Sequence, residues 1–240
     1  VLLQNNANLL PINLSKVKRI AVIGENAIKM MTVGGGSSSL KVKYEVTPLE
    51  GLKKRIGEQA EIIYARGYVG DPTGEYNGVK TGQNLKDDRS PKELRTEALQ
   101  VASNADIVLF IGGLNKSEYQ DCEGTDRKTM DLPYNQNELI MDLLQVNKKL
   151  VVINISGTGV AMPWKNHVST ILQAWYLGSE TGNALASILM GDVNPSGKLP
   201  YTYYACLNQC GAHKLGEYPG HKGCLLYTSR AHETGAYLVC

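Results

Sequence analysis

The sequence predicts an α/β fold in which a mostly parallel sheet is doubly wound and sandwiched by helices. The expected strands are near-continuous runs of Val, Ile and Leu rather than alternating patterns, which indicates burial on both faces of the sheet. Helical segments separate these runs along the chain, as parallel strands joined by right-handed crossovers require. A length of 240 residues, with 42% hydrophobic and 20% charged residues, fits one large soluble α/β domain.

The first elements follow from local signals. Lys18–Gly24 is an apolar strand ended by glycine. Thr47–Glu50 is a capping box with proline at the first helical position, so a helix is expected from there to about Ile56, with Gly57 ending it. The next apolar run, Ala60–Gly67, is the second expected strand.

The middle of the chain begins with a polar segment, Tyr68–Arg89, which is rich in Gly, Asp and Asn and is expected to be a long loop. Ser90–Glu93 repeats the capping-box chemistry and opens a helix to about Asn104. The strand Asp106–Gly113 follows, and it is the most strongly apolar segment of this region.

The last predicted elements alternate in the same way. One helix is expected over Asn135–Val146, because its Leu and Ile side chains recur on one face. Another is expected to begin at Thr181 and to end at Met190, before a closing glycine. The remaining strands are expected at Lys149–Ser156, Thr170–Trp175 and Lys198–Tyr204.

Acidic side chains gather directly after the strand that ends at Gly113. The segment Glu118–Pro133 contains several carboxylates and Arg127, and it should form a loop at the carboxyl end of that strand, where open α/β sheets bind ligands. An acid there could transfer protons, but no comparable second carboxylate site occurs in the chain. Because proton-transfer chemistry needs a partner group, the loop is predicted to form half of an active site. The alternative is a solvated loop in which Asp126 and Arg127 form a structural ion pair.

Two glycine-rich segments resemble phosphate-binding loops but depart from the required spacing. Gly34–Ser39 comes too long after its strand and too long before the next helix for a dinucleotide fingerprint. It is read instead as a glycine turn that lets the backbone approach a ligand, or as a flexible connection. Gly191–Lys198 has one residue too many between its glycines and is followed by Leu-Pro, so it is read as a turn.

Composition disfavours several other classes. The net charge of +2 comes from scattered basic residues, which gives no indication of nucleic acid or a membrane surface as a partner. No apolar run reaches the ~20 residues needed to span a bilayer. The Cys and His residues near the C-terminus fit no closed zinc pattern, so no metal and no cofactor is expected. These are Cys206, Cys210, His213, His221 and Cys224.

Several short motifs follow one another along the chain. They are Leu10-Pro11, Ile20–Gly24, Gly34–Ser38, Val46–Gly51, Glu123–Arg127 with Leu132-Pro133, Met162–Trp164, Ile171–Tyr176, Gly182–Ala186 and Gly191–Pro200. In this order they resemble the C-terminal α/β-sandwich domain of family 3 glycoside hydrolases, the β-glucosidase and β-xylosidase family. The resemblance extends from Val1 to about Gly220 and is strongest to enzymes of Bacteroides-type bacteria.

The resemblance implies a retaining, exo-acting β-glycosidase in which two carboxyl groups act on an oligosaccharide or β-glycoside. An aspartate nucleophile would lie on an N-terminal barrel, and Glu123 occupies the motif position of the general acid/base. Such a glutamate is expected to have a raised pKa. Ser37 and Ser38 would border the sugar pocket.

The resemblance also implies that the chain is a fragment that lacks the barrel and does not hydrolyse glycosides alone. Residues 1–17 are expected to link it to that barrel, 18–204 to form the sandwich, 205–220 a loop, and 221–240 an irregular tail that resembles translated adapter DNA in part. The alternative function is a stand-alone carbohydrate-binding or partner-docking module. Similar bacterial enzymes are commonly periplasmic or secreted, which is the expectation for the parent protein.

Overall fold

The computed structural model describes residues 1–32, 40, 42–71, 75–76 and 79–210. Its main sheet has six strands in the order β1-β8-β7-β6-β2-β3. All neighbouring strands run parallel except β1, which pairs with β8 antiparallel. The strands span Leu2–Asn5 (β1), Arg19–Ile23 (β2), Glu61–Ala65 (β3), Ile107–Gly113 (β6), Leu150–Ile155 (β7) and Thr170–Gln173 (β8).

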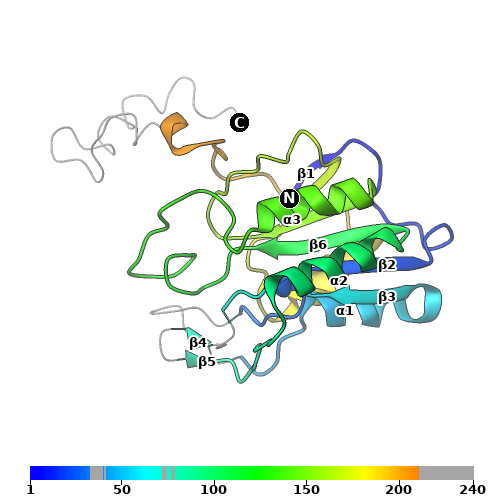
Figure 1. Ribbon diagram of the computed structural model, residues 1–240, viewed down its shortest axis with the longest axis horizontal. Coiled ribbons are helices and arrows are strands. Elements are labelled where there is room, and N and C mark those ends of the chain that lie inside the picture. Colours follow the sequence, from blue (N-terminus) through cyan, green and yellow to red (C-terminus); the bar gives the residue numbers. More distant parts are fainter. Residues whose placement is uncertain (33–39, 41, 72–74, 77–78, 211–240) are drawn as a thin grey trace.

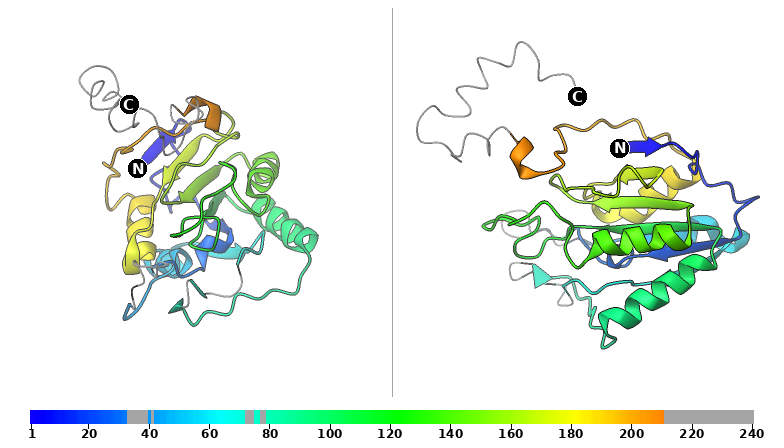
Figure 2. Two further views of the ribbon diagram at one scale, coloured as in Figure 1. Left: turned by 90° about the vertical axis from the view of Figure 1, so that its left-hand side faces the viewer. Right: turned by 45° about the horizontal axis from the view of Figure 1, so that its top comes forward.

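Helices cover both faces of this sheet (Figures 1 and 2). On one side α1 (Pro48–Ile56) packs against α4 (Thr181–Met190), and on the other α2 (Pro91–Ser103) lies beside α3 (Gln136–Val146). Short 3₁₀ turns η1 (Glu25–Ala27), η3 (Gly57–Gln59), η4 (Gly178–Glu180) and η5 (Leu207–Gln209) complete the assigned helical segments. The doubly wound α/β prediction is thus confirmed.

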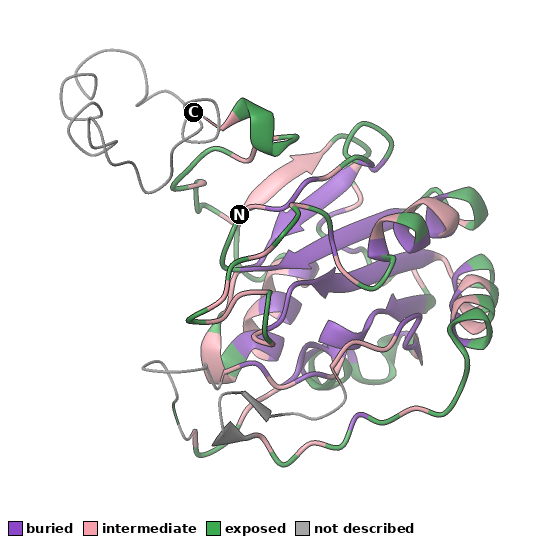
Figure 3. Cartoon of the chain, turned by 60° about the vertical axis from the view of Figure 1, so that its left-hand side comes forward, coloured by how far each residue is buried: buried purple, intermediate pink, exposed green. Residues whose placement is uncertain are grey.

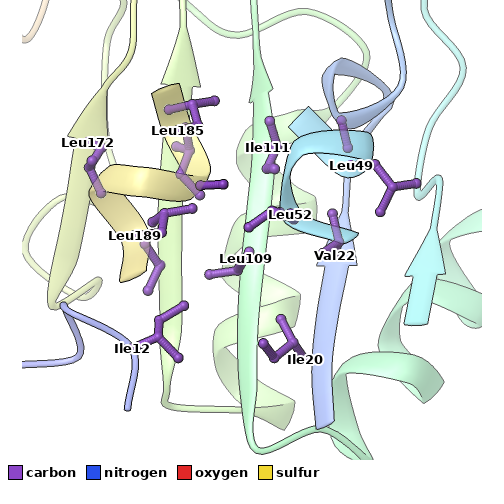
Figure 4. Packing of buried hydrophobic residues seen from close by; sticks show 14 of the residues in the cluster. Ile12, Ile20, Val22, Leu49, Leu52, Leu109, Ile111, Leu172, Leu185 and Leu189 are labelled. Atoms are coloured by element: carbon purple, nitrogen blue, oxygen red, sulfur yellow. The ribbon is translucent and has the colours of Figure 1, made fainter. Parts of the chain in front are cut away.

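Two apolar cores fill the spaces between the sheet and its helix layers. Under α1 and α4, Leu52, Leu185 and Leu189 meet strand side chains such as Leu109 (Figure 4). Under α2 and α3, the core includes Phe110 and other fully buried side chains. Strands β6, β7 and β8 are buried along their whole length (Figure 3), as their continuous apolar sequences predict.

The strand order reverses direction between β2 and β6. From β2 the chain moves outward to β3, and then crosses back to β6 before continuing through β7 to β8. The carboxyl ends of β2 and β6 therefore flank the topological switch point, where open α/β sheets bind ligands. The acidic loop follows β6 directly, so it lies at this point.

The N-terminal residues differ from the predicted domain boundaries, which placed residues 1–17 outside the sandwich. Leu2–Asn5 forms β1 at the edge of the sheet, and Leu2 pairs with Leu172 across a local irregularity in register. A strand of four residues is too short to show a periodicity, and its pairing with a distant segment leaves no local signal. The sheet therefore includes part of the expected linker.

The expected strand over Lys198–Tyr204 is also wrong, because these residues have no strand assignment. Pro200 lies in the middle of the segment and has no amide proton for a ladder hydrogen bond. The tyrosines pack instead on the loop after β7: the Tyr201 hydroxyl donates to the Gly157 carbonyl at 2.9 Å. Within the expected loop of residues 68–89, β4 (Glu75–Tyr76) and β5 (Val79–Lys80) form a separate two-stranded sheet.

Candidate active site

Glycines close the two strands that flank the switch point. Gly24 and Gly113 have φ angles of 118° and 123°. A Cβ on Gly24 would lie 2.1 Å from the Ile111 carbonyl oxygen, and a Cβ on Gly113 would lie 2.1 Å from that of Ile155. Only glycine fits both the positive φ and the close approach of the neighbouring strand. These residues let the chain turn sharply out of the sheet into the site loops.

Asp121 anchors the acidic loop to the ends of β7 and β8. Its carboxylate accepts hydrogen bonds from the Gly157 amide at 2.7 Å, from the Thr158 hydroxyl, and from the Tyr176 hydroxyl at 2.9 Å. Its own amide donates to the Asn115 carbonyl at 3.0 Å. Both carboxylate oxygens are thus engaged with groups that follow neighbouring strands.

Other contacts hold the loop on either side of Asp121. The Ser117 hydroxyl donates to the Asp71 carboxylate at 2.7 Å, and the Gln120 side-chain amide donates to the Tyr134 hydroxyl at 2.6 Å. Arg127 donates to the Gly159 carbonyl. Arg127 and Asp126 form no ion pair in the described part of the chain, so the loop is held by contacts with other segments.

Glu123 is exposed and lies between Tyr119 and Thr125, the segment that forms the loop tip. The tip is closed by Thr125, whose hydroxyl accepts from the Tyr119 amide at 2.9 Å and lies 3.1 Å from the Cys122 sulfur. Gly124 makes the turn with a φ of 87°. Glu123 is thus an exposed residue two positions after Asp121, which is itself half-buried.

A buried charge cluster, which the sequence analysis missed, lies after β2, the strand on the other side of the switch point from β6. Glu25 begins η1 directly after β2 and is 1% exposed. It accepts from Arg66 at 2.7 Å and from the Gly70 amide at 2.6 Å, and the Lys29 ammonium lies 3.3 Å away. Lys29 also donates to the Asp71 carbonyl at 2.5 Å. The cluster thereby fixes the segment that receives Ser117.

The charge cluster could have been suspected from its position. Glu25 is an acid directly after a buried strand, in the same relation to β2 as the acidic loop is to β6. Its partners Arg66 and Gly70 are 41 and 45 residues further along the chain, so their pairing has no local signature.

Aromatic residues differ in their placement. Trp164 is fully buried in the core and its indole donates to Asn137 at 2.9 Å. Trp175 is only partly buried, has a φ of 55°, and contacts the rings of Tyr201 and Tyr203. The Lys116 ammonium lies 4.8 Å from the Tyr176 ring centre, and burial lowers its pKa.

Three further expectations concern the two serines of the proposed sugar pocket, metal binding and membrane-spanning segments. Ser37 and Ser38 lie outside the described residues. Within the described ranges, no group of three or more His, Cys, Asp or Glu side chains is arranged to hold a metal ion. None of the helices in those ranges is both long and apolar enough to cross a membrane.

Comparison with known proteins decides the family. A model of the glycosyl hydrolase family 3 C-terminal domain matches residues 1–238. The chain belongs to this family. The family 3 domain is 46% identical over 228 residues to β-glucosidase BoGH3A of Bacteroides ovatus, a match that covers 92% of this chain and 30% of that relative. The resemblance inferred from the ordered motifs, including its Bacteroides-type character, is thus confirmed.

Other matches agree with this assignment. A β-xylosidase of Formosa agariphila is 35% identical over 211 residues, which covers 85% of this chain and 26% of that protein. The crystal structure of a Bifidobacterium adolescentis family 3 β-glucosidase superposes with a TM-score of 0.73 at 32% identity, covering 93% of this chain and 29% of that one. The family 3 domain thus spans less than a third of the length of these relatives.

Proposed function

We propose that this domain is the second domain of a retaining, exo-acting β-glycosidase, in which it supplies Glu123 as the general acid/base. The observation that carries the proposal is the placement of Glu123 at the exposed tip of a loop that leaves the sheet at its switch point and is anchored to the ends of β7 and β8. Family membership and the β-glucosidase and β-xylosidase names of its relatives support the reaction class. The substrate is an oligosaccharide or another β-glycoside.

The chemistry requires a second carboxyl group about 5 Å from the first. One carboxylate attacks the anomeric carbon to form a glycosyl-enzyme, while the other carboxylic acid protonates the departing oxygen. The second group then acts as a base and removes a proton from the water that hydrolyses the intermediate. In this proposal Glu123 has the acid/base role, and an N-terminal barrel of the same polypeptide provides the nucleophile.

The geometry favours Glu123 over the two competing carboxylates. Asp121 uses both of its oxygens to accept hydrogen bonds from the protein, so it has little capacity left for a glycosidic oxygen. Glu118 is exposed but precedes the segment of the loop that Asp121 anchors. Glu123 is exposed and follows this anchor by two residues.

Three further parts of the proposal concern the whole protein. Ser37 and Ser38, in the glycine-rich segment Gly34–Ser39, border the sugar pocket. The barrel packs on the carboxyl edge of this sheet and completes the site. The parent protein is periplasmic or secreted, and the similarity of the chain to a periplasmic β-glucosidase of Salmonella typhimurium supports this.

The test is a Glu123→Gly substitution in the full-length protein, assayed on β-glycosides with alkyl, sugar and dinitrophenyl leaving groups. For alkyl or sugar leaving groups, which need protonation, kcat/KM should fall by about 10²–10⁴-fold. For a dinitrophenyl leaving group, which departs without a proton, kcat/KM should change little. Azide should accelerate turnover of the activated substrate, because the anion attacks the glycosyl-enzyme without base assistance and yields a glycosyl azide.

Glu118→Gly is the matched control, and azide should not affect its turnover. The isolated 240-residue chain, which lacks the proposed nucleophile, should release no aglycone from any of these substrates. A Glu123→Gly enzyme that hydrolyses all substrates with equal loss, and that azide does not accelerate, would refute the assignment. Sugar binding by the isolated chain would then favour the module interpretation.

A further inference from the structure

The contacts of Asp121 suggest a role in the reaction that goes beyond holding the fold together. We infer that Asp121 is a positioning residue, which fixes the proposed acid/base Glu123 relative to the leaving-group oxygen. This inference rests on the function proposed above. Asp121 does not touch the substrate in this account, because its oxygens are occupied by Gly157, Thr158 and Tyr176.

Asp121 joins three segments of the chain. Its backbone amide holds the start of the acidic loop through the Asn115 carbonyl. Its side chain receives donors from the loop after β7 and from Tyr176, which lies beyond the end of β8. A carboxylate that accepts several hydrogen bonds is held more firmly than a neutral acceptor, since charge-assisted bonds are roughly twice as strong.

Glu123 follows the Asp121 anchor by only two residues in the chain. Two residues span at most about 7 Å even when fully extended, so a fixed Asp121 confines the Glu123 backbone to a small volume. The loop tip adds a second restraint, because the Tyr119 amide donates to the Thr125 hydroxyl. The hydrogen bonds that Asp121 accepts from Gly157, Thr158 and Tyr176 tie this tip to the ends of β7 and β8, beside the contacts of Ser117, Gln120 and Arg127 with other segments.

Tyr176 links the Asp121 anchor to a positively charged side chain, Lys116. Tyr176 donates to Asp121 while its ring face carries the Lys116 ammonium 4.8 Å from the centre. Lys116 is itself half-buried. The Lys116 ammonium, the Tyr176 phenol and the Asp121 carboxylate thus form one connected group next to the loop tip. Loss of the Asp121 charge would weaken the bond from the Tyr176 hydroxyl and leave Glu45 as the remaining carboxylate that acts on Lys116.

The test uses Asp121→Asn and Tyr176→Phe in the full-length protein. Misplacement of a catalytic group by about 1 Å can cost on the order of 10²-fold. Asp121→Asn should therefore lower kcat/KM for alkyl or sugar leaving groups by about 10–100-fold, through kcat rather than KM. For the dinitrophenyl leaving group kcat/KM should change by less than about threefold, because no proton is needed. Tyr176→Phe should show the same selectivity with a smaller loss.

Glu118→Gln is the matched control, since it removes one carboxylate from the same loop and should show no leaving-group selectivity. An equal loss for both leaving groups would overturn the inference and leave Asp121 with a purely structural role. Azide acceleration of Asp121→Gly, with formation of a glycosyl azide, would also overturn it by making Asp121 the acid/base. If Asp121→Asn fails to fold, the selectivity of Tyr176→Phe still decides. Failure of the proposed function itself is separate, because it is read from Glu123→Gly.

Discussion

At the scale of single residues, the most unusual feature is the buried charge of Glu25. Removing two charges from water is costly, and their attraction offsets the cost only when the remaining hydrogen bonds are also made. Glu25 meets this condition, since Arg66, Lys29 and the Gly70 amide all contact its carboxylate. The side chains of Glu25 and Lys29 are 1% and 0% exposed. Such a cluster is sensitive to the loss of any member.

Glu25→Ala is therefore expected to destabilise the domain strongly. It leaves Lys29 and Arg66 buried without their shared carboxylate, and breaking a buried pair costs about 3–5 kcal/mol. Urea unfolding followed by circular dichroism would measure this loss. Asp192→Asn is the control: it breaks the exposed pair with Arg55 and should cost only a small fraction of the same free energy. Equal losses in the two variants would contradict the buried-cluster account.

The residue scale also shows what a sequence can and cannot reveal about the site. The position of Glu123 was predictable because the acidic loop and its preceding strand are contiguous in the chain. The partners of Asp121 were not predictable, because Gly157, Thr158 and Tyr176 lie 36, 37 and 55 residues downstream. These contacts depend on strand order, which no local pattern specifies.

At the scale of elements, α1 and α4 pack unusually closely through glycine. A Cβ on Gly51 would lie 2.1 Å from the Gly182 carbonyl oxygen, and a Cβ on Gly182 would lie 2.0 Å from that of Thr47. The neighbouring atoms are backbone, so they cannot rotate away. The Gly182 amide uses this proximity to donate to the Val46 carbonyl at 2.9 Å.

Gly51→Ala should therefore destabilise the domain, although alanine has the higher intrinsic helix propensity. Overpacking typically costs about 1–3 kcal/mol, and here the two helices must separate to admit a methyl group. Thermal unfolding would measure the loss. Lys53→Ala, on the exposed side of the same helix, should stay within about 0.5 kcal/mol of the parent. A stabilised Gly51→Ala variant would show that propensity outweighs packing at this contact.

Elements with local signals were predicted well. The capping boxes at Thr47 and Ser90 form as expected, and α1 and α2 begin at the prolines that follow them. Each box needs contacts between residues only three apart, so its chemistry can be read directly. By contrast, β1 depends on pairing Leu2 with Leu172, and the expected strand around Pro200 fails because its tyrosines pack on a distant loop.

At the scale of the whole molecule, several carboxylates are held in their charged form by hydrogen bonds. The Ser90 side chain lowers the pKa of Glu93, the amides of Lys18 and Arg19 lower that of Asp106, and the hydroxyl of Tyr44 lowers that of Glu180. Arg55 has the same effect on Asp192, and Arg89 on Asp87. The partners of Asp106, Glu180 and Asp192 are distant in the chain, whereas those of Glu93 and Asp87 are local. All five carboxylates are charged in the folded state, so their combined titration affects global stability.

Acid should accordingly unfold the domain in a defined pH range. Each folded-state pKa lies below its ordinary value of 3.8 for Asp or 4.5 for Glu, so the unfolded chain binds protons first as the pH falls. The stabilisation is complete above about pH 5 and is lost as the pH falls through the folded-state values. The urea midpoint should thus be nearly constant between pH 7 and pH 5 and decline below it. Asp106→Asn should flatten this decline, because the substituted side chain no longer titrates; an unchanged slope in that variant would exclude Asp106 as a contributor.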